Sequence, residues 1–261
     1  MTVEEKAAQL FIVTPEQLSG TGLVLQADEA FREGLQNKPV CGITYFGGNV
    51  ENAGQTKALL AGTQAQAREL SVMPLLLCVD EEGGMVQRIG GKSGFDAPFI
   101  ESASDIGATG DVSVARASAR SIAITLHELG FNVDFAPSCD VATSARSNMR
   151  YRSFGAEAAL VGRMAAAQIE VFGEEGILCC AKHFPGIGDP EDDSHALSIY
   201  SEKTREQLDE QLAPFVAAIV AGVPMVMVGH LSLPQVTGSA IPASISPDIV
   251  QGILRDDIGY D

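Results

Sequence analysis

The chain has 261 residues, 46% of them hydrophobic, which is enough to build one large domain around a full core. Its 34 acidic and 17 basic side chains leave a formal net charge of −17, and this charge repels nucleic-acid phosphates and anionic lipid surfaces. The composition therefore argues against nucleic acid and membranes as partners, and we expect residues 1–261 to form a single domain.

The start of the chain and its cysteines bear on the cellular compartment. Thr2 and Glu5 form the T-x-x-E pattern of a helix-capping box. The first residues do not show the basic start followed by an apolar stretch that marks a signal peptide. The longest apolar stretch, 217–228, is too short to span a bilayer. Five cysteines, an odd number set in or beside apolar runs, fit a reducing compartment. We expect a cytoplasmic protein; the alternative is an extracytoplasmic protein whose export signal has been removed.

Short apolar, β-rich runs alternate with longer helical patterns along the chain, which is typical of a parallel sheet with helical crossovers. Six strands are predicted, at residues 10–13, 41–46, 75–79, 132–136, 177–181 and 225–228. Apolar side chains at the 3.6-residue helical period occupy the stretches 59–70, 115–129 and 208–219. A last helix is predicted to have Ser246 as its N-cap, Pro247 in its first helical position and Gly259 at its end. The fold class expected is α/β, a (β/α) barrel of the TIM type with about six of its eight βα units present.

Polar side chains gather where the fifth predicted strand ends. Lys182 and His183 follow that strand directly, and the glycine-containing segment after them carries Asp193 and His195. Ligands bind at the carboxyl ends of strands in parallel α/β folds, so we expect a site here. A carboxylate close to an imidazole suits general acid–base catalysis, and the alternative is an incidental pair in a surface loop.

Other predicted strands end in further candidates. Asp80 opens the run D-E-E-G-G after the third strand, with Arg88 beyond it, and Arg152 follows the fourth strand, which Asp134 and Asp140 flank. The structural alternatives are that Asp80 accepts backbone donors in its own turn and that Arg152 pairs with a surface carboxylate.

The same region contains several side chains that could bind a metal ion. The candidate ligands are His183, Asp189, Asp193, His195 and His230. Neither H-E-x-x-H nor H-x-H spacing occurs, and Lys182 places a positive charge beside any ion bound at His183. The sequence therefore predicts neither a metal nor another cofactor.

Taken in order, these segments resemble motifs of the bacterial β-N-acetylhexosaminidases of glycoside hydrolase family three. The most specific is Lys182-His183-Phe184-Pro185-Gly186 followed by Asp193-Ser194-His195. Further blocks that resemble the family in chain order are residues 4–10, 42–46, 79–88, 132–137, 152–154 and 229–234. One such match arises easily by chance, whereas an ordered set does not.

The resemblance implies a TIM-type barrel that acts as a retaining, exo-acting glycosidase on a carbohydrate. The implied reaction removes a terminal β-linked N-acetylglucosamine from muropeptide or chitin-type saccharides. His195, oriented by Asp193, corresponds to the catalytic acid/base. The positions that correspond to sugar-binding residues are Asp80, Arg88, Arg152, Lys182 and His183.

The resemblance also places the aspartate nucleophile on a strand after Gly259, beyond Asp261. Because retention needs a carboxylate that forms a glycosyl-enzyme, we expect the 261-residue chain alone to be inactive. We also expect the unpaired edges of an incomplete barrel to favour self-association. The alternatives are a non-catalytic carbohydrate-binding protein and a β-glucosidase or β-xylosidase of the same family, against which the Asp193/His195 pair argues.

Overall fold

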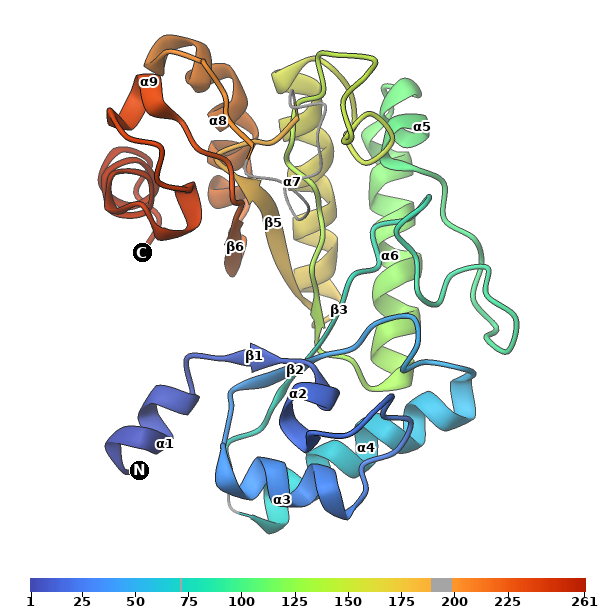
Figure 1. The fold of residues 1–261 in the computed structure, drawn as a ribbon. Coiled ribbons are helices and arrows are strands. Elements are labelled where there is room, and N and C mark those ends of the chain that lie inside the picture. Colours follow the sequence, from blue (N-terminus) through green and yellow to red (C-terminus); the bar gives the residue numbers. More distant parts are fainter. Residues whose placement is uncertain (71, 189–198) are drawn as a thin grey trace.

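A computed structural model of the chain describes residues 1–70, 72–188 and 199–261. Six parallel strands lie side by side in chain order and curl into a half-barrel with helices on its outside (Figure 1). The strands are β1 (Ile12–Val13), β2 (Gly42–Thr44), β3 (Leu76–Val79), β4 (Val133–Asp134), β5 (Leu178–Phe184) and β6 (Met225–Val228). The six predicted strands and the (β/α) barrel class are therefore confirmed.

The helices alternate with these strands. They are α1 (Val3–Ala8), α2 (Pro15–Ser19), α3 (Glu29–Asn37), α4 (Ala53–Glu69), α5 (Ala103–Ala108), α6 (Val112–Leu129), α7 (Ala158–Glu174), α8 (Arg205–Val220), α9 (Pro234–Thr237), η1 (Ala243–Ile245) and η2 (Asp248–Asp257). The predicted capping box at the start of α1 is confirmed, because Thr2 and Glu5 each accept the other's backbone N–H. No helix in the described part of the chain is long and apolar enough to cross a membrane.

The start of the last helix differs from the prediction by one residue. Pro247, not Ser246, holds the N-cap position of η2, and no side chain caps it. The Ser246 carbonyl still accepts a hydrogen bond from the N–H of Val250, at 2.9 Å. The helix is wound in wide π-type turns, and in its last turn the Ile258 N–H donates to the carbonyl of Ile253. The prediction of Ser246 as N-cap is therefore wrong.

Strand β5 is longer at its carboxyl end than the sequence pattern indicated. It continues through Phe184, so Lys182 and His183 lie in the strand and not in the loop after it. Lys182 pairs with Met227 of β6, and the register shifts between Lys182 and Phe184. The pattern missed this extension because charged residues inside a buried strand carry no apolar signal.

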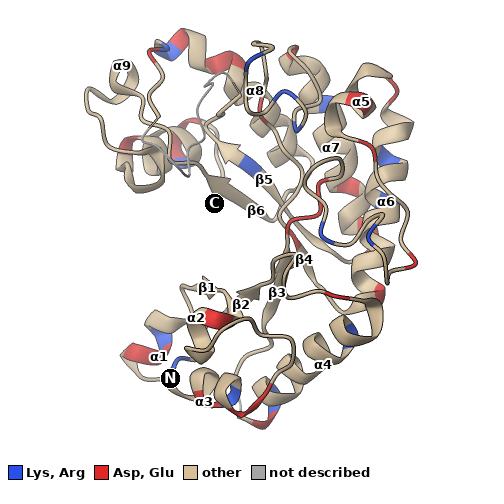
Figure 2. Ribbon diagram, turned by 45° about the vertical axis from the view of Figure 1, so that its right-hand side comes forward, with Lys and Arg blue, Asp and Glu red and all other residues tan. Residues whose placement is uncertain are grey.

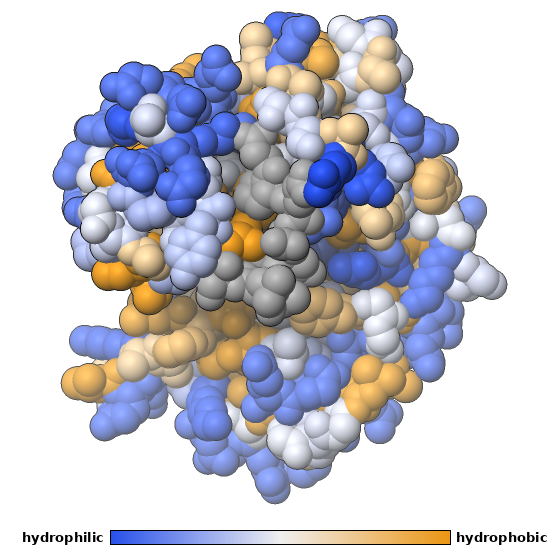
Figure 3. Space-filling model, turned by 45° about the horizontal axis from the view of Figure 1, so that its top comes forward, coloured by the Kyte–Doolittle hydropathy of each residue, from blue (hydrophilic) through white to orange (hydrophobic). Residues whose placement is uncertain are grey.

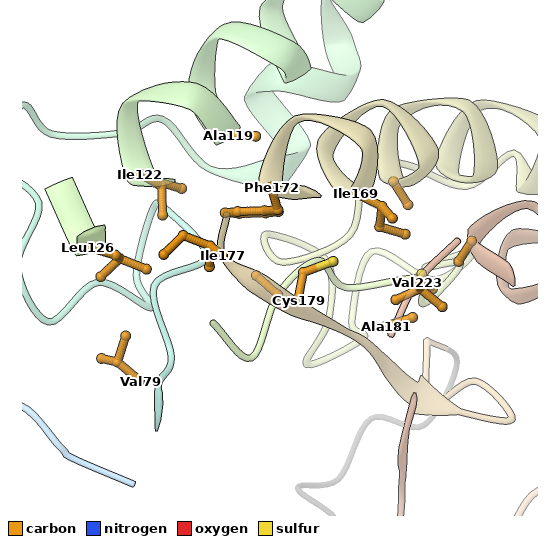
Figure 4. Close-up of a cluster of buried hydrophobic side chains, with 14 of the residues drawn as sticks. Val79, Ala119, Ile122, Leu126, Ile169, Phe172, Ile177, Cys179, Ala181 and Val223 are labelled. Atoms are coloured by element: carbon orange, nitrogen blue, oxygen red, sulfur yellow. The ribbon is translucent and has the colours of Figure 1, made fainter. Parts of the chain in front are cut away.

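An apolar layer between the sheet and the outer helices fixes the position of β5 along its own axis. Figure 4 shows Ile122 and Leu126 of α6 and Phe172 of α7 gathered over the start of β5, near Ile177 and Cys179. All five side chains are buried. Because close-packed interiors tolerate little displacement, this layer holds the carboxyl end of β5 in a fixed position.

The open side of the half-barrel leaves apolar groups in contact with solvent. Leu10 and Phe11, directly before β1, are exposed. In the space-filling view, apolar residues lie in the hollow between the part of the chain that carries α1 to α4 and the part that carries the last helices (Figure 3).

Two helical glycines give a matched test of the packing. A Cβ on Gly107 of α5 would lie 1.8 Å from the backbone oxygen of Phe154, whereas a Cβ on Gly173 of α7 meets no heavy atom within 4 Å. We expect Gly107→Ala to lower the free energy of unfolding by about 1–3 kcal/mol through overpacking. Gly173→Ala should raise it by about 0.5–1 kcal/mol, because alanine favours the helix. Chemical denaturation measures both, and equal effects of the two variants would contradict the packing described.

Candidate active site

The carboxyl ends of β3 and β5 meet at a buried ammonium group. Lys182 Nζ lies 2.7 Å from Asp80 Oδ1 and 2.6 Å from Glu82 Oε1, and its side chain is only 1% exposed. In Figure 2 the basic residue within β5 is Lys182, the only lysine or arginine of that strand. A buried cation needs compensating charge, so Asp80 and Glu82, which follow β3, are tied to β5 through Lys182.

An arginine and a histidine extend this arrangement. Arg152 donates to both carboxylate oxygens of Glu82, from Nε at 2.9 Å and from Nη2 at 2.6 Å. Arg152 Nη2 also lies 3.4 Å from His183 Nε2, and His183 Nδ1 lies 2.8 Å from Asp140 Oδ2. We call these six side chains the rim cluster: Asp80, Glu82, Asp140, Arg152, Lys182 and His183.

Asp140 fixes the orientation of the His183 ring. Its carboxylate accepts from the backbone N–H of Ile187 at 2.7 Å and from the hydroxyl of Ser138 at 3.0 Å. The backbone around it is held to β5, because the N–H of Cys139 donates to the carbonyl of Lys182 at 2.6 Å. Burial alone would raise the pKa of Asp140, but His183 and these hydrogen bonds lower it below its usual value.

The charges of the rim cluster stabilise one another. Burial would raise the pKa of Glu82, yet the Lys182 ammonium and the Arg152 guanidinium outweigh burial and lower that pKa to about 2. Burial would lower the pKa of Lys182, but the carboxylates of Glu82 and Asp80 raise it instead. Both groups are therefore charged at neutral pH.

The rim cluster has a buried floor and an open edge. The side chains of Lys182 and Glu82 are 1% and 5% exposed, whereas those of Asp80 and Arg152 are 21% and 23% exposed. A ligand that approaches from solvent meets a carboxylate acceptor and a guanidinium donor side by side. This combination suits neighbouring hydroxyl groups, because each hydroxyl donates one hydrogen bond and accepts another.

Four of the five predicted sugar-binding residues are brought together, namely Asp80, Arg152, Lys182 and His183. Arg88 is placed differently: its backbone N–H donates to Glu81 Oε2 at 2.6 Å, and its buried Nε has no partner among the described residues. The predicted acid/base His195 and its partner Asp193 lie outside the described residues, so their roles stay predictions.

Sequence reasoning did not single out Glu82 or assign a role to Asp140. A usable signal for Glu82 was its spacing from Asp80, because residues two apart in an extended segment share a face. Glu81, on the other face, accepts from the backbone N–H groups of Arg88, Ile89 and Gly90 at 2.6, 3.1 and 2.7 Å. For Asp140 the sequence offered only its position after a strand.

A second buried acid lies next to this segment. Asp134 Oδ1 accepts the backbone N–H of Glu81 at 3.0 Å, and Oδ2 has no partner in the described part of the chain. Burial raises the pKa of Asp134 well above its ordinary value. No three His, Cys, Asp or Glu side chains among residues 1–70, 72–188 and 199–261 form a metal-binding group.

Comparison with known proteins identifies the family. The model of the glycosyl hydrolase family 3 N terminal domain matches residues 2–261, and the chain belongs to this family. A beta-hexosaminidase of Stenotrophomonas maltophilia is 32% identical over 248 residues, which cover 93% of this chain and 70% of that protein. Beta-hexosaminidase A of Pseudoalteromonas piscicida is 33% identical over 237 residues, but only 39% of its length is covered.

Solved structures agree with this assignment. A glycoside hydrolase family 3 beta-N-acetylglucosaminidase from Paenibacillus sp. superposes on the whole chain with a TM-score of 0.90 and 35% identity, and the chain covers 48% of it. A beta-N-acetylhexosaminidase from Beutenbergia cavernae superposes with a TM-score of 0.87 and 26% identity, and 76% of that chain is covered. The chain therefore spans between 39% and 76% of the length of these relatives.

Removal of the Glu82 charge tests the floor of the rim cluster. Glu82→Gln leaves the buried Lys182 with one carboxylate, so we expect the free energy of unfolding at pH 7 to fall by about 3 kcal/mol. The native pKa of Glu82 is below that of an unfolded glutamate, so this contribution is present above about pH 4.3 and is lost as pH falls toward 2. The control, Glu69→Gln, breaks an exposed pair with Arg32 and should cost less than about 1 kcal/mol. Equal losses in denaturation experiments would contradict the buried arrangement.

Asp134 gives a prediction of opposite sign. A folded pKa above the unfolded value means that stability is fully present below about pH 3.9 and declines as pH rises. The neutral variant Asp134→Asn lacks this decline. Its free energy of unfolding relative to that of the wild type should therefore rise as pH rises, by up to about 1.4 kcal/mol per pH unit. Thermal melts between pH 4 and 8 measure the difference, with the surface variant Asp96→Asn as control. A difference between Asp134→Asn and wild type that is constant with pH would show that Asp134 is ionised.

Proposed function

We propose that the rim cluster binds the terminal sugar of a β-linked N-acetylglucosaminide, and that the protein containing this chain is a retaining, exo-acting β-N-acetylglucosaminidase. The observation that carries the proposal is the buried Lys182 between Asp80 and Glu82, next to Arg152 and His183. The names of the relatives support the sugar, and muropeptide or chitin-type saccharides are the proposed substrate class.

The rim cluster is suited to binding a sugar because its charged groups are already paired and oriented. Asp80 and Arg152 present an acceptor and donors at the open edge, while Glu82 and Asp140 hold Lys182, Arg152 and His183 from behind. Little side-chain freedom is lost when a ligand arrives, so more of the interaction energy serves to position the sugar. A displacement at the sugar's reacting carbon requires this kind of positioning.

For the chemical steps we propose His195 as acid/base, oriented by Asp193, with an aspartate nucleophile after Gly259. In the first step His195 donates a proton to the departing glycosidic oxygen while the aspartate attacks the anomeric carbon. In the second step His195 removes a proton from water as the water oxygen attacks the anomeric carbon, which breaks the bond to the aspartate and releases the sugar with retained configuration. Imidazole suits both directions because its ordinary pKa is near 6.5.

We further propose a cytoplasmic location, which the five free thiols support. The second functional candidate is a β-glucosidase or β-xylosidase, and one observation favours the glucosidase: a relative from Cellulomonas fimi that is 33% identical over 205 residues carries the name beta-N-acetylglucosaminidase/beta-glucosidase. The relatives from Pseudoalteromonas piscicida and Stenotrophomonas maltophilia carry the name beta-hexosaminidase, which supports the N-acetylglucosaminide as first candidate. A non-catalytic carbohydrate-binding protein is separated from the enzyme by the assay that follows.

The assay uses 4-nitrophenyl N-acetyl-β-glucosaminide and a polypeptide that extends past residue 261 through the strand with the proposed nucleophile. We expect turnover in this protein, and a fall in kcat of about 10²–10⁴-fold for His195→Ala, because a general acid/base contributes that factor. The matched control is His127→Ala in the last turn of α6, at the surface, which should leave kcat unchanged.

Other outcomes would each contradict a specific part of the proposal. Full activity of His195→Ala would exclude it as acid/base. Preference for a β-glucoside or β-xyloside would exclude the N-acetylglucosaminidase assignment. Binding of N-acetylglucosamine without any turnover in the extended protein would favour the non-catalytic alternative.

A further inference from the structure

The segment 141–155, between β4 and α7, has an unusual charge for this chain. It contains Arg146, Arg150 and Arg152 but no acidic residue, although the chain as a whole has twice as many acidic as basic side chains. Arg152 is engaged with Glu82 in the rim cluster. The segment therefore places additional positive charge beside the proposed sugar site of a strongly acidic protein.

Arg150 is the exposed cation nearest in sequence to the rim cluster. Its guanidinium carbon lies 4.4 Å from the centre of the Tyr151 ring, and its Nη1 lies 3.4 Å from the carbonyl oxygen of Ser147. Among the described residues it forms no ion pair. Stacking on an aromatic ring limits the orientations of the guanidinium and leaves its N–H edge available to a planar acceptor.

The Arg150–Tyr151 stack has a fixed position relative to the rim cluster. The N–H groups of Arg152 and Ser153 donate to the carbonyl of Met149 at 2.9 and 2.8 Å, which forms a tight turn over a buried methionine. The carbonyl of Tyr151 accepts the N–H of Ser104 at 3.4 Å, and Arg152 is anchored on Glu82. The stack therefore directly precedes Arg152, which lies at the open edge of the site, and Tyr151 is half exposed.

We propose that Arg150, held over Tyr151, is a specificity-determining residue that binds a carboxylate on the leaving saccharide. This inference rests on the proposed function and deepens it, because it selects an acidic wall-derived sugar over a neutral chitin-type sugar. A chain with a net charge of −17 repels an anionic substrate at long range, so selective binding of such a substrate requires local positive charge at the site. The planar guanidinium matches a carboxylate in shape and can form two parallel hydrogen bonds with it.

The test compares two substrates that differ only in whether one carboxyl group is free or methylated. Both have β-linked N-acetylglucosamine attached to a sugar with a lactyl ether; in one the lactyl carboxylate is free, and in the other it is a methyl ester. The enzyme is the extended protein used in the activity assay, and the measured quantity is the ratio of kcat/KM for acid to that for ester. We expect wild type to prefer the acid by about 10-fold and Arg150→Met to lose that preference.

Four further variants separate recognition of the carboxylate from general damage to the protein. Arg150→Lys should retain part of the preference, since charge remains but the planar donor pair is lost. Tyr151→Phe should retain the preference and Tyr151→Ala should reduce it, because the ring positions the guanidinium. Arg32→Met, which removes a surface arginine of α3 that pairs with Glu69, is the matched control and should leave the ratio unchanged.

A wild-type ratio near one, or an unchanged ratio in Arg150→Met, would overturn the inference. If the extended protein hydrolyses neither substrate nor the 4-nitrophenyl glycoside, the proposed function fails instead. The inference is then decided by calorimetry on the same protein, as the ratio of affinities for acid and ester in wild type and Arg150→Met. Loss of an acid preference in the variant would support it, and identical ratios would exclude it.

Discussion

The ammonium group of Lys182 determines how the carboxyl ends of the strands are arranged. A cation with 1% of its side chain exposed is tolerated only beside compensating charge, and Asp80 and Glu82 supply it from the end of β3. Glu82 in turn accepts two hydrogen bonds from Arg152, and this contact holds the segment between β4 and α7 against the site. One buried charge thus links three segments that are far apart in the sequence.

A second set of hydrogen bonds holds these groups from behind. Asp140 orients His183, and Glu81 collects three backbone N–H groups of the loop that carries Arg88. The charged side chains are therefore already desolvated and oriented before a ligand binds. Such preorganisation is the usual basis of selective binding to a polar ligand. Membership of glycosyl hydrolase family 3 gives the site its context, and the proposed sugar chemistry follows from the arrangement of its donors and acceptors.

Much of the fold could be predicted because apolar periodicity marks buried strands and helix faces. The six strands were found in this way, and the capping box of Thr2 was found from its T-x-x-E spacing to Glu5. The end of β5 was missed because Lys182 is buried by ion pairing, which a hydropathy pattern does not register. Glu82 was overlooked within a run of acids, although its spacing from Asp80 indicated a shared face. Asp140 acts through a tertiary contact with His183, and no local pattern reveals such a contact.

The most direct test of the central claim is a crystal structure of the protein in complex with N-acetylglucosamine. The account predicts sugar hydroxyl oxygens within hydrogen-bonding distance of Asp80, Arg152 and Lys182, with Lys182 still in contact with Glu82. A sugar bound elsewhere on the molecule, with the side chains of the rim cluster paired only with one another, would contradict it.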